Sequence, residues 1–150
     1  MINIALYQPE IPQNTAAIIR TCSCFGLKLE IIKPTGFIIN EKKLTRIYMD
    51  YLKNCEITYH ESFDHFLNSK NKMRIILLTT KSKTPYYDFK FNENDTLLFG
   101  SESKGVALNV HQILKLKLNI PINNNSRSLN LATSVAIASS EALRQINLNN

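Results

Sequence analysis

The sequence contains little of what small secreted or metal-binding domains depend on. It has three cysteines, three histidines and no tryptophan in 150 residues. An odd number of cysteines argues against a disulfide framework. Cys22 and Cys24 are spaced C-x-C, but only Cys55 lies elsewhere to complete a metal site, and the histidines show no ligand spacing. We therefore expect free thiols in a reducing compartment and no bound metal.

Long hydrophobic runs are also missing. No apolar run approaches the roughly 20 residues that a membrane-spanning helix needs. The chain starts with Met1-Ile2-Asn3, without the basic region that precedes the apolar run of a secretory signal. The hydrophobic fraction of 44% is nevertheless ordinary for a folded protein. We expect one cytoplasmic domain, residues 1–150, with no membrane segment.

Glycine is scarce where common nucleotide-binding domains need it. The turn after the first predicted strand, Gln8-Pro9-Glu10-Ile11-Pro12-Gln13-Asn14, contains none of the four glycines. A dinucleotide-binding domain or an ordinary Rossmann methyltransferase needs a glycine-rich turn at this place. Gly100 and Gly105 instead fall together in one loop of the second half. We therefore expect the ligand-binding loop there.

Positive charge is in excess, because 18 Lys and Arg stand against 12 Asp and Glu. The resulting net charge of +6, with a pI near 9.3, suits a polyanionic partner such as RNA. The abundance of Asn, Ile and Lys also matches the composition of A- and T-rich genomes. Charge therefore permits RNA binding without establishing it.

Runs typical of strands alternate with helical patterns along the chain. We expect strands at residues 2–7, 28–33, 56–59, 74–79, 96–99 and 117–120, and helices at residues 14–25, 41–52, 62–69, 107–114 and 129–146. This alternation predicts an α/β domain with a mainly parallel sheet and helices on both faces. Ligands of such sheets bind beyond the carboxyl ends of the strands, which directs attention to the segments after Leu78, Phe99 and Ile120.

Two polar segments follow predicted strands in this half of the chain. In the first, from Gly100 to Gly105, the glycines permit close approach of a ligand to the backbone, but an ordinary strand-to-helix turn uses them too. In the second, Ser126, Ser128 and Asn130 precede a long helix and exceed what one helix cap needs. The helix that follows has apolar residues on more than one face, which indicates a subunit interface.

A third segment of interest is the first predicted helix. Pro12 suits its first turn. Arg20 follows Asn14 by nearly two turns and has apolar neighbours. An arginine in this place either extends to the surface or holds a phosphate, for which the planar guanidinium is well shaped.

Taken together, these segments resemble the SPOUT superfamily of knotted methyltransferases. The resemblance is greatest to the minimal tRNA 2'-O-methyltransferase branch, which modifies the ribose of the anticodon wobble nucleotide. It covers nearly the whole chain and is carried by residues 3–15, 18–20, 32–37, 98–105, 120–121 and 126–131. Three such motifs in the right order are far more specific than one.

The resemblance implies a single α/β domain with a deep C-terminal trefoil knot, one of the rare exceptions to unknotted chains. It also implies S-adenosyl-L-methionine (SAM) as the cofactor, S-adenosyl-L-homocysteine (SAH) as its product, no metal, tRNA as the partner and a homodimer. The residues that it places around the cofactor are Leu78, Gly100, Glu102, Gly105, Ile120, Ser128, Leu129 and Asn130. It implies that Asn14 and Arg20 are catalytic, and we expect Arg20 and Arg127 to contact the RNA.

One position departs from the family pattern, because Ser140 stands where close relatives often carry an aromatic residue. Two alternatives stay open. A knotted methyltransferase acting on rRNA or on another tRNA position is disfavoured by chain length, since those relatives often carry added domains. A catalytically silent RNA-binding dimer is disfavoured by the retained motif residues, which are Asn14, Arg20, Glu102, Ser128 and Asn130.

Overall fold

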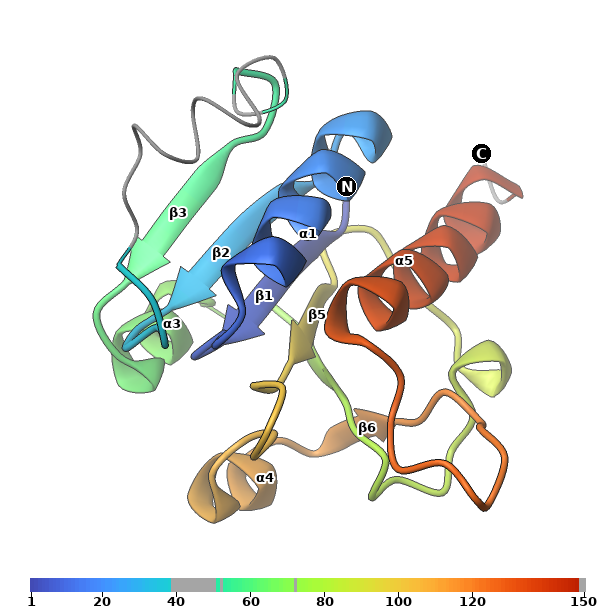
Figure 1. The fold of residues 1–150 in the computed structure, drawn as a ribbon. Coiled ribbons are helices and arrows are strands. Elements are labelled where there is room, and N and C mark those ends of the chain that lie inside the picture. The colour runs from blue at the N-terminus through green and yellow to red at the C-terminus, as the bar shows by residue number, and fades with distance from the viewer. Residues whose placement is uncertain (39–50, 52, 72, 149–150) are drawn as a thin grey trace.

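A computed structural model describes residues 1–38, 51, 53–71 and 73–148 of the chain (Figure 1). Its strands are β1 (Asn3–Tyr7), β2 (Lys28–Ile32), β3 (Ile57–His60), β4 (Ile75–Leu78), β5 (Thr96–Phe99) and β6 (Leu116–Leu118). Its helices are α1 (Pro12–Phe25), α3 (Phe63–Ser69), α4 (Leu108–Ile113) and α5 (Leu131–Leu148), with a short 3-10 turn at Tyr86–Asp88. The predicted α/β class is confirmed, whereas the helix predicted at residues 41–52 falls almost wholly outside the described residues.

The six strands form one sheet in the order β3-β2-β1-β5-β4-β6. Every neighbouring pair is parallel, so the carboxyl ends of all the strands lie at the same edge. The strand order reverses direction between β1 and β5, and open sheets of this kind bind ligands near such a switch point. The predicted trefoil knot stays a prediction.

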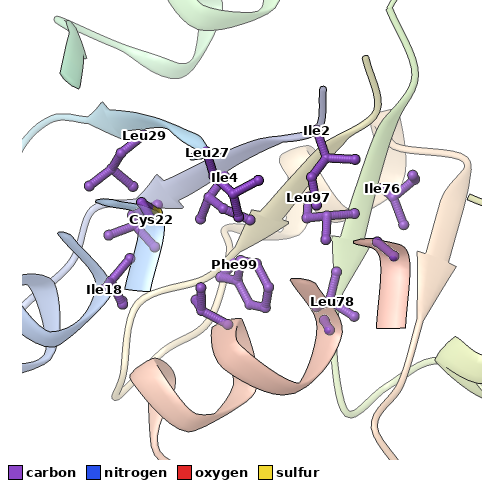
Figure 2. Packing of buried hydrophobic residues seen from close by; sticks show 14 of the residues in the cluster. Ile2, Ile4, Ile18, Cys22, Leu27, Leu29, Ile76, Leu78, Leu97 and Phe99 are labelled. Carbon is purple, nitrogen blue, oxygen red and sulfur yellow. The ribbon is translucent and has the colours of Figure 1, made fainter. Parts of the chain in front are cut away.

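Two apolar layers cover the two faces of the sheet, because alternate residues of a strand point to opposite faces. Ile4 and Leu6 of β1 belong to the layer beneath α1 and α5, whereas Ala5 and Tyr7 belong to the layer beneath α3 and α4. Figure 1 shows α1 and α5 side by side on one face. Figure 2 shows the first layer, in which Phe99 lies between the sheet and the helices.

The boundaries of α1 follow from its sequence. Pro12 occupies the first turn, where a missing N–H costs nothing. Gly26 ends the helix in the left-handed conformation at φ 65°, and its N–H is directed at the carbonyls of Cys22 and Ser23. The prediction began this helix at Asn14, and the structure extends it by two residues. None of the helices among the described residues is both long and apolar enough to cross a membrane.

Candidate functional site

A cavity of about 670 Å³ opens at the carboxyl ends of β4, β5 and β6. It contains all eight residues that the sequence resemblance places around a cofactor, which are Leu78, Gly100, Glu102, Gly105, Ile120, Ser128, Leu129 and Asn130. Asn14 and Arg127 line it as well. Residues from the beginning, middle and end of the chain therefore meet at one place.

The lining of this cavity is divided between apolar and polar groups. Leu77, Leu78, Phe99, Ile120, Ile122, Leu129 and Leu131 supply apolar surface. Thr79, Thr80, Ser128 and Ser134 supply hydroxyl groups. A cavity with apolar walls and a few placed polar groups is the usual form of a site for a small organic ligand. Thr79 is the last residue of the strand predicted at residues 74–79, although β4 ends at Leu78, and Thr80 follows directly. Ser134 lies one helical turn after Asn130, and that spacing could have identified it from the sequence.

The loop between β5 and α4 closes on itself around Gly100 and Gly105. The N–H of Ser101 donates to the Gly105 carbonyl at 3.0 Å, and the N–H of Gly105 donates back to Ser101 at 2.9 Å. A Cβ atom on Gly100 would lie 2.5 Å from the Gly105 carbonyl carbon. Gly105 itself has φ +68° and open space where a Cβ would be. Close approach at Gly100 therefore comes from the loop's own backbone, and Gly105 is required for its left-handed conformation.

The Glu102 carboxylate fastens this loop to the start of α1. Its Oε2 accepts a hydrogen bond from the Glu10 N–H at 2.7 Å, and its Oε1 accepts bonds from the Ile11 N–H and the Asn14 side chain at 3.2 and 3.0 Å. Glu10 forms a second connection between the same two segments, because its carboxylate accepts bonds from the N–H and hydroxyl of Ser103 at 2.8 and 2.7 Å. Those bonds from Ser103 lower the pKa of Glu10. Both oxygens of Glu102 are already in use, so its evident task is positioning.

Asn14 is also hydrogen-bonded to the residue that precedes α5. The Asn130 Nδ2 donates to the Asn14 Oδ1 at 2.8 Å. The Oδ1 of Asn130 accepts from the N–H groups of Ala132 and Thr133 at 2.9 and 3.3 Å, which is the bonding of a helix N-cap. The relay of Glu102, Asn14 and Asn130 thus joins three segments of the chain along the cavity wall. Asn130 is both a cap and a member of the site.

Arg20 is placed differently from the other predicted site residues. Its side chain is exposed on α1, with the guanidinium carbon 5.0 Å from the centroid of the Tyr51 ring. It is not among the described residues that line the cavity. The structure of one chain therefore does not bring Arg20 to the site, and its catalytic role stays a prediction.

Three exposed, positively charged side chains lie at the cavity. Lys81, Lys104 and Arg127 all line it, and no ion pair joins any of the three to another described residue. Burial lowers the pKa of the neighbouring His111, and the charges of Lys117 and Lys81 lower it further. The imidazole is therefore neutral at neutral pH. His111 carried no signal in the sequence.

Within the described part of the chain, no group of three His, Cys, Asp or Glu side chains is arranged to hold a metal ion. Cys22 and Cys55 are buried and Cys24 is exposed, all three as free thiols. The described residues that line the cavity offer hydrogen-bonding groups, apolar walls and positively charged side chains.

Comparison with known proteins connects this arrangement to a family. Residues 1–140 match the model of the SpoU rRNA Methylase family. The chain is 41% identical to a protein of Beijerinckia indica named tRNA (cytidine(34)-2'-O)-methyltransferase, over 95% of this chain and 91% of the relative. An Escherichia coli K12 protein of the same name is 38% identical, over 97% and 94% of the two chains.

The fold also matches that of a solved structure over nearly its whole length. A structure described as giving insights into the 2-OH methylation of C/U34 on tRNA superposes with a TM-score of 0.91. It is 38% identical in sequence, and the match covers 97% of this chain and 95% of that one. The similarity therefore extends over nearly the whole of both chains.

Proposed function

This chain belongs to the SpoU rRNA methylase family, and we propose that it transfers a methyl group from SAM to the ribose 2'-oxygen of nucleotide 34 in tRNA. The observation that carries the proposal is the cavity at the carboxyl ends of β4, β5 and β6, whose wall is held together by Glu102, Asn14 and Asn130. These residues are the ones that the sequence resemblance marks as functional. Relatives similar over nearly their whole length bear the name of this activity.

The cavity suits SAM in size and in chemistry. Its volume of about 670 Å³ falls within the roughly 300–1,000 Å³ of typical small-molecule sites. Leu78, Ile120 and Leu129 can enclose the adenine ring, and polar groups such as the Ser128 hydroxyl can meet the ribose and the amino acid portion. SAM supplies the methyl group as a good electrophile when it is bound. The protein must then hold the ribose hydroxyl in line and keep it oriented.

Alignment is the contribution that the described residues support best. Holding two reactants in a reactive geometry can supply about 7–11 kcal/mol in the best intramolecular models. The Glu102 carboxylate is occupied by protein donors, and His111 is the one histidine among the described residues that line the cavity. We therefore assign the role of general base to neither Glu102 nor His111. A phosphate of the RNA or a water molecule accepts the hydroxyl proton in this proposal.

Positively charged residues provide the RNA contacts. Lys81, Lys104 and Arg127 at the mouth of the cavity can each meet a phosphate. Arg20 is proposed to clamp the phosphate beside the reacting ribose, because its planar guanidinium can bond two phosphate oxygens at once. Its position outside the cavity of its own chain means that another surface must bring it to the reacting group.

A homodimer through α1 and α5 would provide that surface, and we propose this assembly. Helix α5 buries Val135 and Ala138 against the sheet but leaves Ala136 and Ile137 half-exposed on another face. Helix α1 packs beside α5 and carries Arg20 on its exposed side. Pairing of these helices would place Arg20 at the boundary between two subunits. The cytoplasmic location expected from the sequence stays a prediction.

The proposal is tested by calorimetric titration with SAM and SAH, followed by methyl transfer to unmodified tRNA transcripts. We expect one cofactor site per chain and a single modified ribose, located by its resistance to alkaline hydrolysis. Methylation of rRNA or of another tRNA position would contradict the substrate assignment. RNA binding without cofactor binding would contradict the enzyme assignment and favour a silent RNA-binding dimer.

A further inference from the structure

A second cavity, of about 390 Å³, lies behind the loop that forms one wall of the first. The two cavities share Ser101, Lys104, Gly105 and Val106 as a common wall. The opposite wall of the second cavity comes from the end of β1 and from the segment after β2, including Tyr7, Gln8, Pro34 and Thr35. None of these four lines the first cavity.

We propose that this second cavity, the base pocket, binds the nucleobase of the nucleotide that is methylated. The inference rests on the proposed function. A ribose bound beside the first cavity carries its base only one glycosidic bond away, and the shared wall puts the base pocket directly next to that cavity. Bases of single-stranded RNA loops can swing out, and proteins commonly enclose them in pockets of this kind.

The side-chain amide of Gln8 is the polar group that we expect to form hydrogen bonds with the base in this pocket. Its backbone has φ 50°, a left-handed conformation that is uncommon for residues other than glycine. Its N–H donates to the Ile32 carbonyl at 2.9 Å, which fixes the backbone, but its side-chain amide makes no hydrogen bond to another described residue. Uncommon backbone conformations cluster at ligand sites, where the surrounding structure holds them.

Hydrogen bonds and close backbone packing hold the walls around Gln8 in place, so we infer that the base pocket is formed before the base binds. The Gly36 N–H donates to the Pro9 carbonyl at 2.9 Å, and a Cβ at Gly36 would lie 2.8 Å from the Glu10 Cα. The Thr35 hydroxyl donates to the Phe37 carbonyl at 2.6 Å. Glu10 is tied in turn to the shared wall through Ser103. A pocket that needs no rearrangement loses less free energy on binding.

The chemistry of the pocket fits a pyrimidine edge. An amide side chain both donates and accepts hydrogen bonds, so a rotation of the Gln8 amide could match either cytosine or uracil. The Tyr7 and Pro34 side chains offer rigid apolar surface for the faces and rim of the ring. Lys104 on the shared wall can contact the attached sugar or phosphate. This arrangement would let one enzyme accept both pyrimidines at the same position.

The first test removes the amide without disturbing the backbone. Glycine accepts φ 50° freely, so Gln8→Gly should fold normally. We expect KM for an anticodon stem–loop RNA to rise about two- to tenfold, the worth of one or two neutral hydrogen bonds, with SAH affinity unchanged. Asn94→Gly is the matched control, because Asn94 also has φ 66° but precedes β5, away from the carboxyl ends of the strands.

The second test fills the pocket. Ala107 is exposed and lines only the base pocket, whereas its neighbour Leu108 lines neither cavity. Ala107→Phe should raise KM for the RNA and leave SAH affinity as it is in the wild type. Leu108→Phe should change neither quantity. An unchanged KM in both Gln8→Gly and Ala107→Phe would overturn the proposal.

The third test measures whether the effect of removing the base depends on the presence of the Gln8 side chain. A stem–loop that lacks the base at nucleotide 34 should lose about two- to tenfold in kcat/KM with the wild type and less with Gln8→Gly, because their shared contact is already gone. Equal losses in both proteins, or coupling to nucleotide 35 instead, would overturn the assignment. If the wild type methylates no tRNA at all, the proposed function itself fails, and that result is distinct from either outcome.

Discussion

At the scale of single residues, the site is organised by side chains that are already bonded to the protein. The Glu102 carboxylate accepts bonds from two backbone N–H groups and from Asn14. A carboxylate used in this way fixes the relative position of two loops. The residues that line the cavity are then held in place by their neighbours, and substitutions of those neighbours should lower the affinity for the cofactor.

Glu102→Gln tests this positioning role. An amide presents one accepting oxygen and one donating nitrogen, so one group that now donates to Glu102 would face another donor. We expect a loss of about 1.5–3 kcal/mol in the free energy of unfolding, typical of hydrogen bonds to a charged group, and weaker SAH binding. Urea unfolding and calorimetry measure the two effects. Glu93→Gln, at an exposed site, is the control, and wild-type values for Glu102→Gln would contradict the positioning role.

Arg20→Ala separates catalysis from cofactor binding. If Arg20 orients the phosphate and ribose during the reaction, SAH affinity should stay near the wild-type value while single-turnover methylation slows about 10- to 100-fold. Arg20→Lys should rescue little, because an ammonium group lacks the bidentate geometry. Near-normal methylation by Arg20→Ala would show that the guanidinium only packs over Tyr51.

At the scale of elements, the strands were predictable because their signal is local. The runs Ile75–Leu78 and Leu97–Phe99 are continuously apolar, and the strands that contain them are buried on both faces. The last strand was predicted to reach Ile120, but its ladder with β4 stops at Leu118. Asn119 changes partners there, since its N–H donates to the Thr84 carbonyl and its own carbonyl accepts from Tyr86.

Contacts between elements could not be predicted from the sequence, because they join residues that are far apart along the chain. Asn14 was identified by motif, yet its bonds to Glu102 and Asn130 span 88 and 116 residues. No local pattern encodes such a pairing, because it depends on how the loops meet after folding. The predicted start of the last helix at Leu129 was wrong by two residues, since the side chain of Asn130 caps the helix that begins at Leu131.

Asn130 variants distinguish the cap from the relay. Asn130→Ala removes both and should lower the free energy of unfolding by about 1 kcal/mol as well as weakening SAH binding. Asn130→Asp keeps an acceptor for Ala132 and Thr133 but loses the donor to Asn14. We therefore expect Asn130→Asp to be more stable than Asn130→Ala and similarly impaired in SAH affinity. Full SAH affinity in Asn130→Asp would show that only the cap is needed.

At the scale of the whole molecule, one small domain has to bind a cofactor and grip a much larger RNA. The proposed homodimer would explain both the half-exposed apolar face of α5 and the exposed position of Arg20 on α1. Sedimentation should give twice the chain mass of 17.2 kDa at micromolar concentration, with an interface of about 1,600 Å² or more. Ile137→Glu should shift the equilibrium toward the monomer. A wild-type monomer at that concentration would contradict the dimer.

The most direct test of the central claim is methyl transfer to an anticodon stem–loop that differs from the substrate by one oxygen. We predict that the protein with SAM methylates a stem–loop carrying cytidine or uridine at nucleotide 34, and that mass spectrometry locates one added methyl group on that ribose. The same RNA with a 2'-deoxyribose at nucleotide 34 should receive none, because the accepting oxygen is absent. Methylation of the deoxy substrate, or of the wild-type RNA at any other nucleotide, would contradict the account.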